Sequence, residues 1–454
     1  MWLAAAIAGF ATYHGFRSLR EAYGLPLLVS VATIAFWYLG DVLYNDQDGR
    51  YESLFKNGIN GDAWFEVAIF LNSLVFAAPR IHRWANRTLL SRSSRVFDLV
   101  DGGADHPGLQ RMLPTFLALC STIWLTIIVI ALIRLGGDAV HFVFPVFGQK
   151  MSPFGRSRVG SGISALLSLG HYLQVLAATG FGLVWALSTN RSQRTMALVG
   201  MATTWPYFIF DRTRHGTLMV CLPTVLAYVF VRMRGPHWRK VFVLCVALLI
   251  TDSWFRIVME ARTAQMSVLD YAFSSQPAET DDRKRPSGGR HEGLNMFEEL
   301  CWVNKYIRDG SYQVNWGERY FAELVNPVPR ALWPGKPLIG MDYAIARGMA
   351  QTGKRYSAAD GGVNASISTG IVGQGVVNFG RVLGPIAAAL IMAGWIAFLA
   401  RLDLQGELAG RLPLYALGIV SIFNMGRDIT LLLLYPLLFG YLFLRLFYDR
   451  RQAT

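Results

Sequence analysis

A proline-rich stretch in the C-terminal half carries the residues best suited to binding an anion. It runs from Asn326 to Pro337, and four of the eleven residues from Pro327 onward are proline. Each proline fixes φ and removes a backbone donor, which argues against a long helix or a central strand. We expect the resulting irregular path to display Arg330 and Lys336 on either side of Trp333. Two fixed cations beside an aromatic plane suit a phosphate and a sugar ring. The alternative is a stiff surface loop with a packed tryptophan.

Other cations stand in short connections between apolar runs. Arg212 and Arg214 lie in the turn 210–216, and Arg427 precedes Asp428 in an otherwise apolar C-terminal region. Arginines in a short outer loop are unusual, because short loops rich in Lys and Arg normally lie on the cytoplasmic side of a membrane. A charged side chain within an apolar region is also costly, at about 2.5 kcal/mol or more at the centre of the bilayer. An anionic ligand is one explanation. The alternatives are a miscounted span for the turn, and a surface pair between Arg427 and Asp428.

These cations define one expected surface. We expect the following residues to converge on the outer face: Arg212, Arg214, Arg330, Lys336, Arg347, Arg355 and Arg427. The sequence contains no HExxH, GxSxG or P-loop pattern, which makes zinc proteolysis and nucleotide hydrolysis poor interpretations. A cationic cavity over a membrane body indicates a lipid-linked phosphate as ligand, with no metal and no cofactor required.

The composition places these residues in a polytopic membrane protein. The chain has 454 residues, of which 53% are hydrophobic and 16% charged, whereas soluble domains carry about a quarter charged residues. A net charge of +13 fits cationic cytoplasmic loops and pockets for anionic lipid headgroups better than nucleic acid. The four cysteines form no CxxC pair, so neither a disulfide framework nor a structural zinc site is expected.

Apolar runs predict an all-α fold with about eleven transmembrane helices, at roughly 20 residues per span. The candidate ranges are 2–14, 26–44, 64–80, 113–135, 160–187, 195–210, 217–233, 239–257, 381–400, 411–426 and 429–447. They divide the chain into an N-terminal bundle (1–257), one large periplasmic loop (258–380) and C-terminal transmembrane helices (381–454).

Short-loop arginines and lysines set the orientation. Basic connections such as 80–95, 191–194 and 232–240 fall on one side if the spans alternate, so that side is predicted to be cytoplasmic. The N-terminus and the 258–380 loop then lie outside. Within that loop, residues 274–292 are polar and indicate a flexible segment, whereas apolar residues at helical spacing from Leu294 to Tyr306 predict an amphipathic helix.

The proline-rich stretch also carries a family resemblance. Pro-Arg-Ala-Leu-Trp-Pro-Gly-Lys-Pro at 329–337, followed by Gly-Gln-Gly at 373–375 and Asn-Phe-Gly at 378–380, resembles Wzy-type O-antigen polymerases, also called oligosaccharide repeat unit polymerases. The strong match covers about 60 residues. The turn with Arg212 and the late Arg427 resemble that family's periplasmic arginines.

The resemblance implies a bacterial inner-membrane glycosyltransferase of the GT-C type with its active site facing the periplasm. Its donor would be a growing glycan on undecaprenyl diphosphate, and its acceptor one lipid-linked repeat unit. Membrane lipid and a chain-length regulator are the other partners to expect, and nucleic acid is not. An O-antigen ligase and a flippase of lipid-linked oligosaccharide are alternatives. A transporter should show paired halves, and no such internal symmetry is visible.

The residues take roles within that reaction. Arg330 and Arg427 would bind the diphosphate, where fixed arginines stabilise the charge that grows on the leaving group. Trp333 would stack on a sugar. Binding residues beside them would be Arg212, Arg214, Lys336, Arg347 and Arg355. The general base would be a carboxylate near the acceptor hydroxyl, and Asp211, Asp342 and Asp428 remain open as candidates.

Overall fold

A computed structural model gives the fold. It describes residues 2–19, 21–88, 103–145, 151–154, 164–210, 214–263, 268–273, 294–325, 328, 332–337, 343, 346–347, 368–402, 411–429, 434–443 and 446. Across these residues every regular element is helical and there is no strand, so the predicted all-α class is confirmed for this part of the chain.

Among the described residues, five helical stretches are long and apolar enough to cross a membrane. The first is Gly24–Asn45, made of α2 (Gly24–Ile34), η1 (Ala35–Leu39) and α3 (Gly40–Asn45), and the second is Ile59–Ala85 within α5 (Ile59–Thr88). The third is Pro107–Val143, with α7 (Pro107–Leu135), η3 (Gly136–Asp138) and α8 (Ala139–Val143). The last two are Trp238–Val258 within α12 (His237–Thr263) and α17 (Gly370–Ala400). The membrane character is therefore supported by length and composition, whereas the total of eleven spans stays a prediction.

Further helices occupy the other predicted ranges. They are α1 (Trp2–Arg17), α9 (Ser164–Leu187), α10 (Arg191–Ile209), α11 (Arg214–Ala227) with η5 (Tyr228–Arg232), α18 (Leu412–Arg427) and α19 (Tyr435–Phe443). The remaining elements are α4 (Arg50–Leu54), η2 (Gly103–Asp105), α13 (Val268–Phe273), α14 (Met296–Arg308) and α15 (Glu318–Val325).

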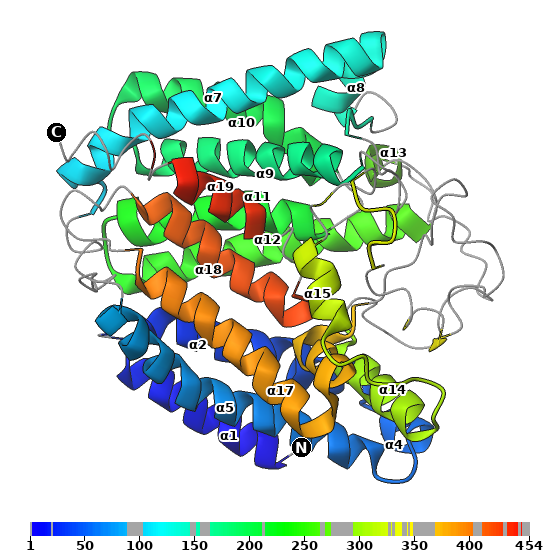
Figure 1. Cartoon of the computed structure of the whole chain (residues 1–454). Helices are drawn as coiled ribbons and strands as arrows, with labels where there is room; N and C mark the ends of the chain where they lie inside the picture. Colours follow the sequence, from blue (N-terminus) through cyan, green and yellow to red (C-terminus); the bar gives the residue numbers. More distant parts are fainter. Residues whose placement is uncertain are drawn as a thin grey trace.

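The long helices lie side by side, and α14 and α15 cover one end of the bundle (Figure 1). The prediction of an amphipathic helix over 294–306 is confirmed by α14, which buries Met296, Phe297, Leu300 and Val303. Leu300 is spaced i+4 from Met296 and i+3 from both Phe297 and Val303, which places these residues on one helical face. Both helices belong to the 258–380 connection, so this connection is packed onto the bundle through them.

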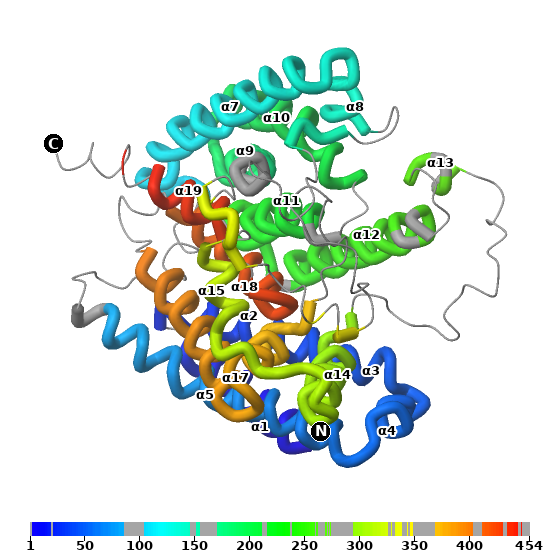
Figure 2. Tube along the Cα trace, turned by 45° about the vertical axis from the view of Figure 1, so that its right-hand side comes forward, coloured from blue at the N-terminus to red at the C-terminus, as the bar shows by residue number. Residues whose placement is uncertain are grey.

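Helix α17 is two helices joined at Gly380. This glycine has φ 76° and ψ −175°, a conformation open to glycine and strained for other residues, and it reverses the chain. We call residues Gly370–Phe379 the half-helix; it folds back beside the long part of α17, as Figure 2 shows. The backbones meet at Gly375 and Gly384, where a Cβ on either residue would fall 2.3 Å from the other's carbonyl oxygen.

A buried ionic network joins the N-terminal helices to α14 and α17. Glu66 of α5 is fully buried and accepts hydrogen bonds from Asn304 Nδ2 at 2.7 Å and from Arg381 Nε at 3.1 Å. Arg381 also forms an ion pair with Asp62 at 2.5 Å. Because a carboxylate inside a membrane bundle is costly unless it is paired, these contacts fix the residue that follows the chain reversal at Gly380.

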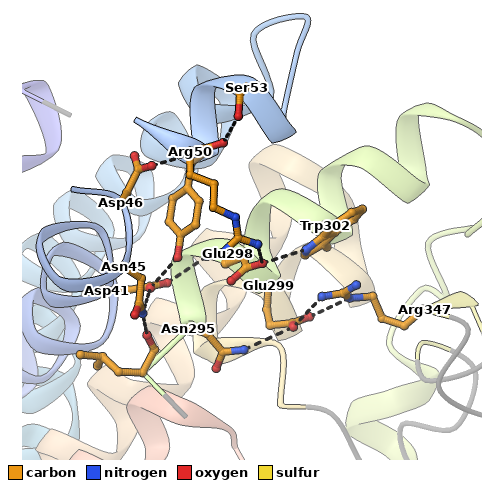
Figure 3. Close-up of polar contacts among 12 residues, drawn as sticks. Asp41, Asn45, Asp46, Arg50, Ser53, Asn295, Glu298, Glu299, Trp302 and Arg347 are labelled. Carbon is orange, nitrogen blue, oxygen red and sulfur yellow. Dashed lines mark hydrogen bonds and ion pairs between the residues drawn. The ribbon is translucent and has the colours of Figure 1, made fainter. Parts of the chain in front are cut away.

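Asp41 makes a second connection between the bundle and α14 (Figure 3). Its Oδ2 accepts the backbone amides of Phe297 at 2.8 Å and Glu298 at 2.9 Å, which are first-turn donors of α14. Its Oδ1 accepts hydrogen bonds from Tyr51 Oη and Asn45 Nδ2, both at 2.8 Å. A side chain from α3 therefore supplies the N-terminal cap that α14 does not receive from its own Asn295.

Candidate functional site

The half-helix holds α15 against the end of the bundle. The backbone amide of Tyr320 donates to Asn378 Oδ1 at 3.2 Å, that of Asn315 to the Val377 carbonyl at 3.1 Å, and that of Gly317 to the Asn378 carbonyl at 3.2 Å. The turn before α15 uses positive φ at Gly317, with φ 92°. These hydrogen bonds set the position of the side chains that α15 carries.

The half-helix also holds the chain that leaves α18. Gln374 Nε2 donates to the Ile429 carbonyl at 3.0 Å, and the Ile429 amide donates to Gln374 Oε1 at 2.8 Å. This paired arrangement satisfies both backbone groups of Ile429 directly after Arg427 and Asp428. The side chain of Gln374 is fully buried, so its amide has no competing water contact.

Arg319 of α15 meets Arg427 and Asp428 between these two segments, and Glu323 lies one helical turn after Arg319 on α15. We call these four residues the charged cluster. Arg319 and Asp428 form an ion pair at 3.5 Å, with side chains 3% and 21% exposed. Burial raises the pKa of Asp428, while the nearby Arg319 and Arg427 act in the opposite direction. Arg427 ends α18 and is exposed as a residue, while burial among its neighbours lowers the pKa of its guanidinium.

Two tyrosines lie near one member of this cluster, Glu323. Glu323 is buried, and its charge acts electrostatically on the phenols of Tyr172 in α9 and Tyr435 in α19. The rings of Tyr172 and Tyr435 are in edge contact, with centroids 6.1 Å apart. Cations, carboxylates and aromatic rings at the end of an apolar bundle can bind a phosphate group together with a sugar.

Among the predicted site residues, Arg427 and Asp428 enter this cluster. The alternative of an Arg427–Asp428 surface pair is not what the structure has, because Asp428 forms its ion pair with Arg319 from α15. A separate ion pair joins Arg256 and Asp252, which are spaced i, i+4 on α12 and lie 2.8 Å apart.

The expectation that Lys336 is displayed beside Trp333 is wrong. Lys336 is buried, at 7% exposure, and its Nζ donates to the Val328 carbonyl at 2.9 Å. A backbone oxygen within the same proline-rich stretch thus binds the ammonium group. Trp333 remains 37% exposed and contacts Phe321 of α15 edge-on, with ring centroids 6.2 Å apart. Trp333 therefore keeps a surface on which a ligand ring can stack.

Arg347 also has a protein partner in place of the predicted ligand (Figure 3). Its Nη2 and Nε lie 3.0 and 3.3 Å from the two carboxylate oxygens of Glu299, and its guanidinium lies 4.3 Å from the ring centroid of Trp302. Tyr343 Oη donates to the same carboxylate at 2.8 Å. Both Glu299 and Trp302 belong to α14, so these contacts hold Tyr343 and Arg347 against that helix.

This pairing predicts a stability defect for Arg347→Ala. The side chain of Glu299 is only 4% exposed, so losing the arginine leaves a buried carboxylate with reduced compensation. We expect a cost of about 2 kcal/mol in the free energy of unfolding, seen as a lower midpoint of thermal unfolding in detergent. Arg256→Ala, at an exposed ion pair, should shift the midpoint far less. An unchanged midpoint for Arg347→Ala would leave this arginine available to a ligand instead.

Several predicted residues lie outside the described part of the chain: Asp211, Arg212, Arg330, Asp342 and Arg355. Arg214 is the first residue of α11, and its side chain is likewise not described. The structure therefore does not test the predicted convergence of all seven cations.

Sequence reasoning missed the residues of α15 and gave no role to the half-helix. Arg319 and Glu323 carry a signal in retrospect, because they are spaced i, i+4 in a short amphipathic segment. Gln374 and Asn378 have the same spacing within an apolar run, which is where a polar residue needs a partner.

Comparisons with protein-family models, with curated proteins and with solved structures found no match for this chain.

Proposed function

We propose that this protein is a membrane glycosyltransferase that joins lipid-diphosphate-linked oligosaccharide repeat units into a surface polysaccharide. The observation that carries the proposal is the charged cluster, which gathers two arginines and two carboxylates at the end of a bundle of apolar helices. The exposed Arg427 beside a buried ion pair suits a ligand that is anionic and approaches from the membrane. The partially exposed Trp333, which packs against Phe321 of α15, suits its sugar.

The proposed reaction needs no external energy source. The acceptor hydroxyl oxygen attacks the anomeric carbon of the donor glycan, and the bond from that carbon to the diphosphate oxygen breaks. The electron pair leaves with the diphosphate, and the hydroxyl proton passes to a carboxylate. Arg427 stabilises the growing negative charge, an effect that commonly amounts to several kcal/mol in a water-poor site. Asp428 is the described candidate base, with the transfer on the periplasmic side of the inner membrane.

The test is a transfer assay with purified protein and a lipid-linked repeat unit from the source strain, without nucleotide sugar or added metal. We expect a ladder of lipid-linked products, and a loss of about 100-fold or more in rate for Arg427→Ala. Arg256→Ala is the matched control, because it removes an exposed arginine from a different helix, α12. Its ladder should equal that of the parent protein.

Other outcomes contradict the proposal in distinct ways. Transfer that occurs only when a lipid A–core acceptor is added would identify a ligase. Donor binding without any transfer would favour movement of the lipid-linked oligosaccharide across the membrane. A normal ladder from Arg427→Ala would remove the charged cluster from the reaction.

A further inference from the structure

We propose that Gln374 and Asn378 of the half-helix are positioning residues that set the distance between α15 and the Arg427–Asp428 segment. This inference rests on the proposed function for its kinetic consequence, although its geometric consequence can be measured without any activity. The two amides lie one helical turn apart and both are completely buried.

Each amide holds one side of the charged cluster. Gln374 makes two hydrogen bonds to the backbone of Ile429, next to Asp428, and Asn378 accepts the amide of Tyr320, next to Arg319. Asn378 Nδ2 donates to the Gln374 carbonyl at 2.7 Å, so the second amide is tied to the residue that carries the first. The Arg319–Asp428 ion pair is thus formed between two segments that the same ten-residue half-helix supports.

The half-helix is itself held in place at both ends. At its start, the Val372 amide donates to Tyr38 Oη at 2.9 Å. Near its middle, Gly375 contacts the backbone of Gly384, and after the reversal Arg381 is paired with Asp62 and Glu66. A support fixed at three points can hold two charged segments in one relative position.

A positioning role predicts a specific kinetic pattern. Interactions that act only through the geometry of reacting groups change kcat, and misplacement by about 1 Å can cost about 100-fold. Ground-state binding of the lipid diphosphate involves Arg427, which Gln374 does not contact through its side chain. Loss of Gln374 should therefore lower kcat while KM for the donor changes by about twofold or less.

The first variant is Gln374→Met, which keeps the size of the side chain and removes both hydrogen bonds to Ile429. The matched control is Gln174→Met on α9, because Gln174 is also completely buried and its amide has no hydrogen-bond partner among the described residues. We expect kcat to fall by about 100-fold in Gln374→Met and to stay at the parental value in the control. Gln374→Glu retains the acceptor for the Ile429 amide and should show a smaller loss.

A distance measurement tests the same inference without turnover. Spin labels are placed at Leu324 on α15 and Leu383 on α17, which are 64% and 59% exposed, with Cys221 and Cys245 replaced by alanine. Leucine has nearly the shape of asparagine but cannot form its hydrogen bonds. In Asn378→Leu, the distribution of distances between the two labels should therefore broaden. In Gln174→Met it should remain as narrow as in the parent.

The outcomes separate the two proposals. If the parent protein makes no polymer but Asn378→Leu broadens the distribution, the proposed function fails and the positioning role of Asn378 stands. If the distribution is unchanged in Asn378→Leu, or if Gln374→Met raises KM with kcat unchanged, the positioning role is overturned. If Gln374→Met elutes as an aggregate, Gln374→Glu takes its place in the kinetic assay. An unaltered kcat in Gln374→Glu also overturns the positioning role.

Discussion

Gly384→Ala should be among the most destabilising single substitutions in this chain. The new Cβ would fall 2.3 Å from the Gly375 carbonyl oxygen and 2.6 Å from the Val376 amide nitrogen. These atoms belong to the backbone of the half-helix, so they cannot move without displacing it. Overpacking of this kind costs about 3 kcal/mol, and here the half-helix must also separate from the long part of α17.

The same helix offers a matched control in Gly394→Ala. A Cβ at Gly394 has no heavy atom within 4 Å, and alanine is the better helix former. In detergent, the midpoint of thermal unfolding of Gly384→Ala should therefore lie below that of the parent protein. The midpoint of Gly394→Ala should be unchanged or higher. Equal midpoints for the two variants would show that the contact between Gly375 and Gly384 is not tight.

Asp41→Ala should detach the start of α14 from the bundle. The substitution removes the acceptor of two first-turn amides of α14 and of the buried Tyr51 hydroxyl, whereas the Asn45 side-chain amide keeps its hydrogen bond to the Leu294 carbonyl. Each buried donor left unsatisfied costs about 1–3 kcal/mol, so we expect a total loss of about 4 kcal/mol after partial rehydration. The loss should concentrate in α14, because its cap comes from this one side chain.

Hydrogen exchange followed by mass spectrometry locates this effect. Peptides that contain Phe297 and Glu298 should lose protection in Asp41→Ala, while those from α7 should keep theirs. Asp48→Ala is the control, because Asp48 is exposed in the connection that follows α3. Protection of α14 that survives in Asp41→Ala would mean that its apolar face alone fixes the helix.

Hydropathy and periodicity identified the elements that are governed by local sequence. The apolar ranges coincide with helices, and the helix over 294–306 followed from residues that recur on one face. The half-helix was not predicted, because glycines at 370, 373, 375 and 380 make the segment a poor helix by propensity. The half-helix forms because its small residues let it lie against the long part of α17. This is a contact between two backbone segments, and the local sequence pattern of the half-helix does not predict it.

The partners of charged residues could not be predicted for a related reason. Arg347 was interpreted as a ligand-binding cation, yet its carboxylate partner Glu299 lies 48 residues earlier in the chain. Lys336 is bound by a carbonyl oxygen of the proline-rich stretch, which depends on how that stretch turns. The Arg427–Asp428 segment was found because charges interrupt an apolar run, whereas Arg319 lies in a polar context where one more arginine attracts no notice.

The buried acids of the first helices have a consequence for synthesis. The amide of Phe297 follows Asp41 by 256 residues, and Arg381 follows Glu66 by 315. At about 5–20 residues per second, the ribosome takes on the order of 15–60 s to add the missing partners. Throughout that interval the nascent N-terminal helices carry carboxylates whose partners in α14 and α17 have not yet been synthesised. We therefore expect an insertion chaperone to act on the chain at this stage. We also expect a protease that degrades stalled chains to act at the same stage.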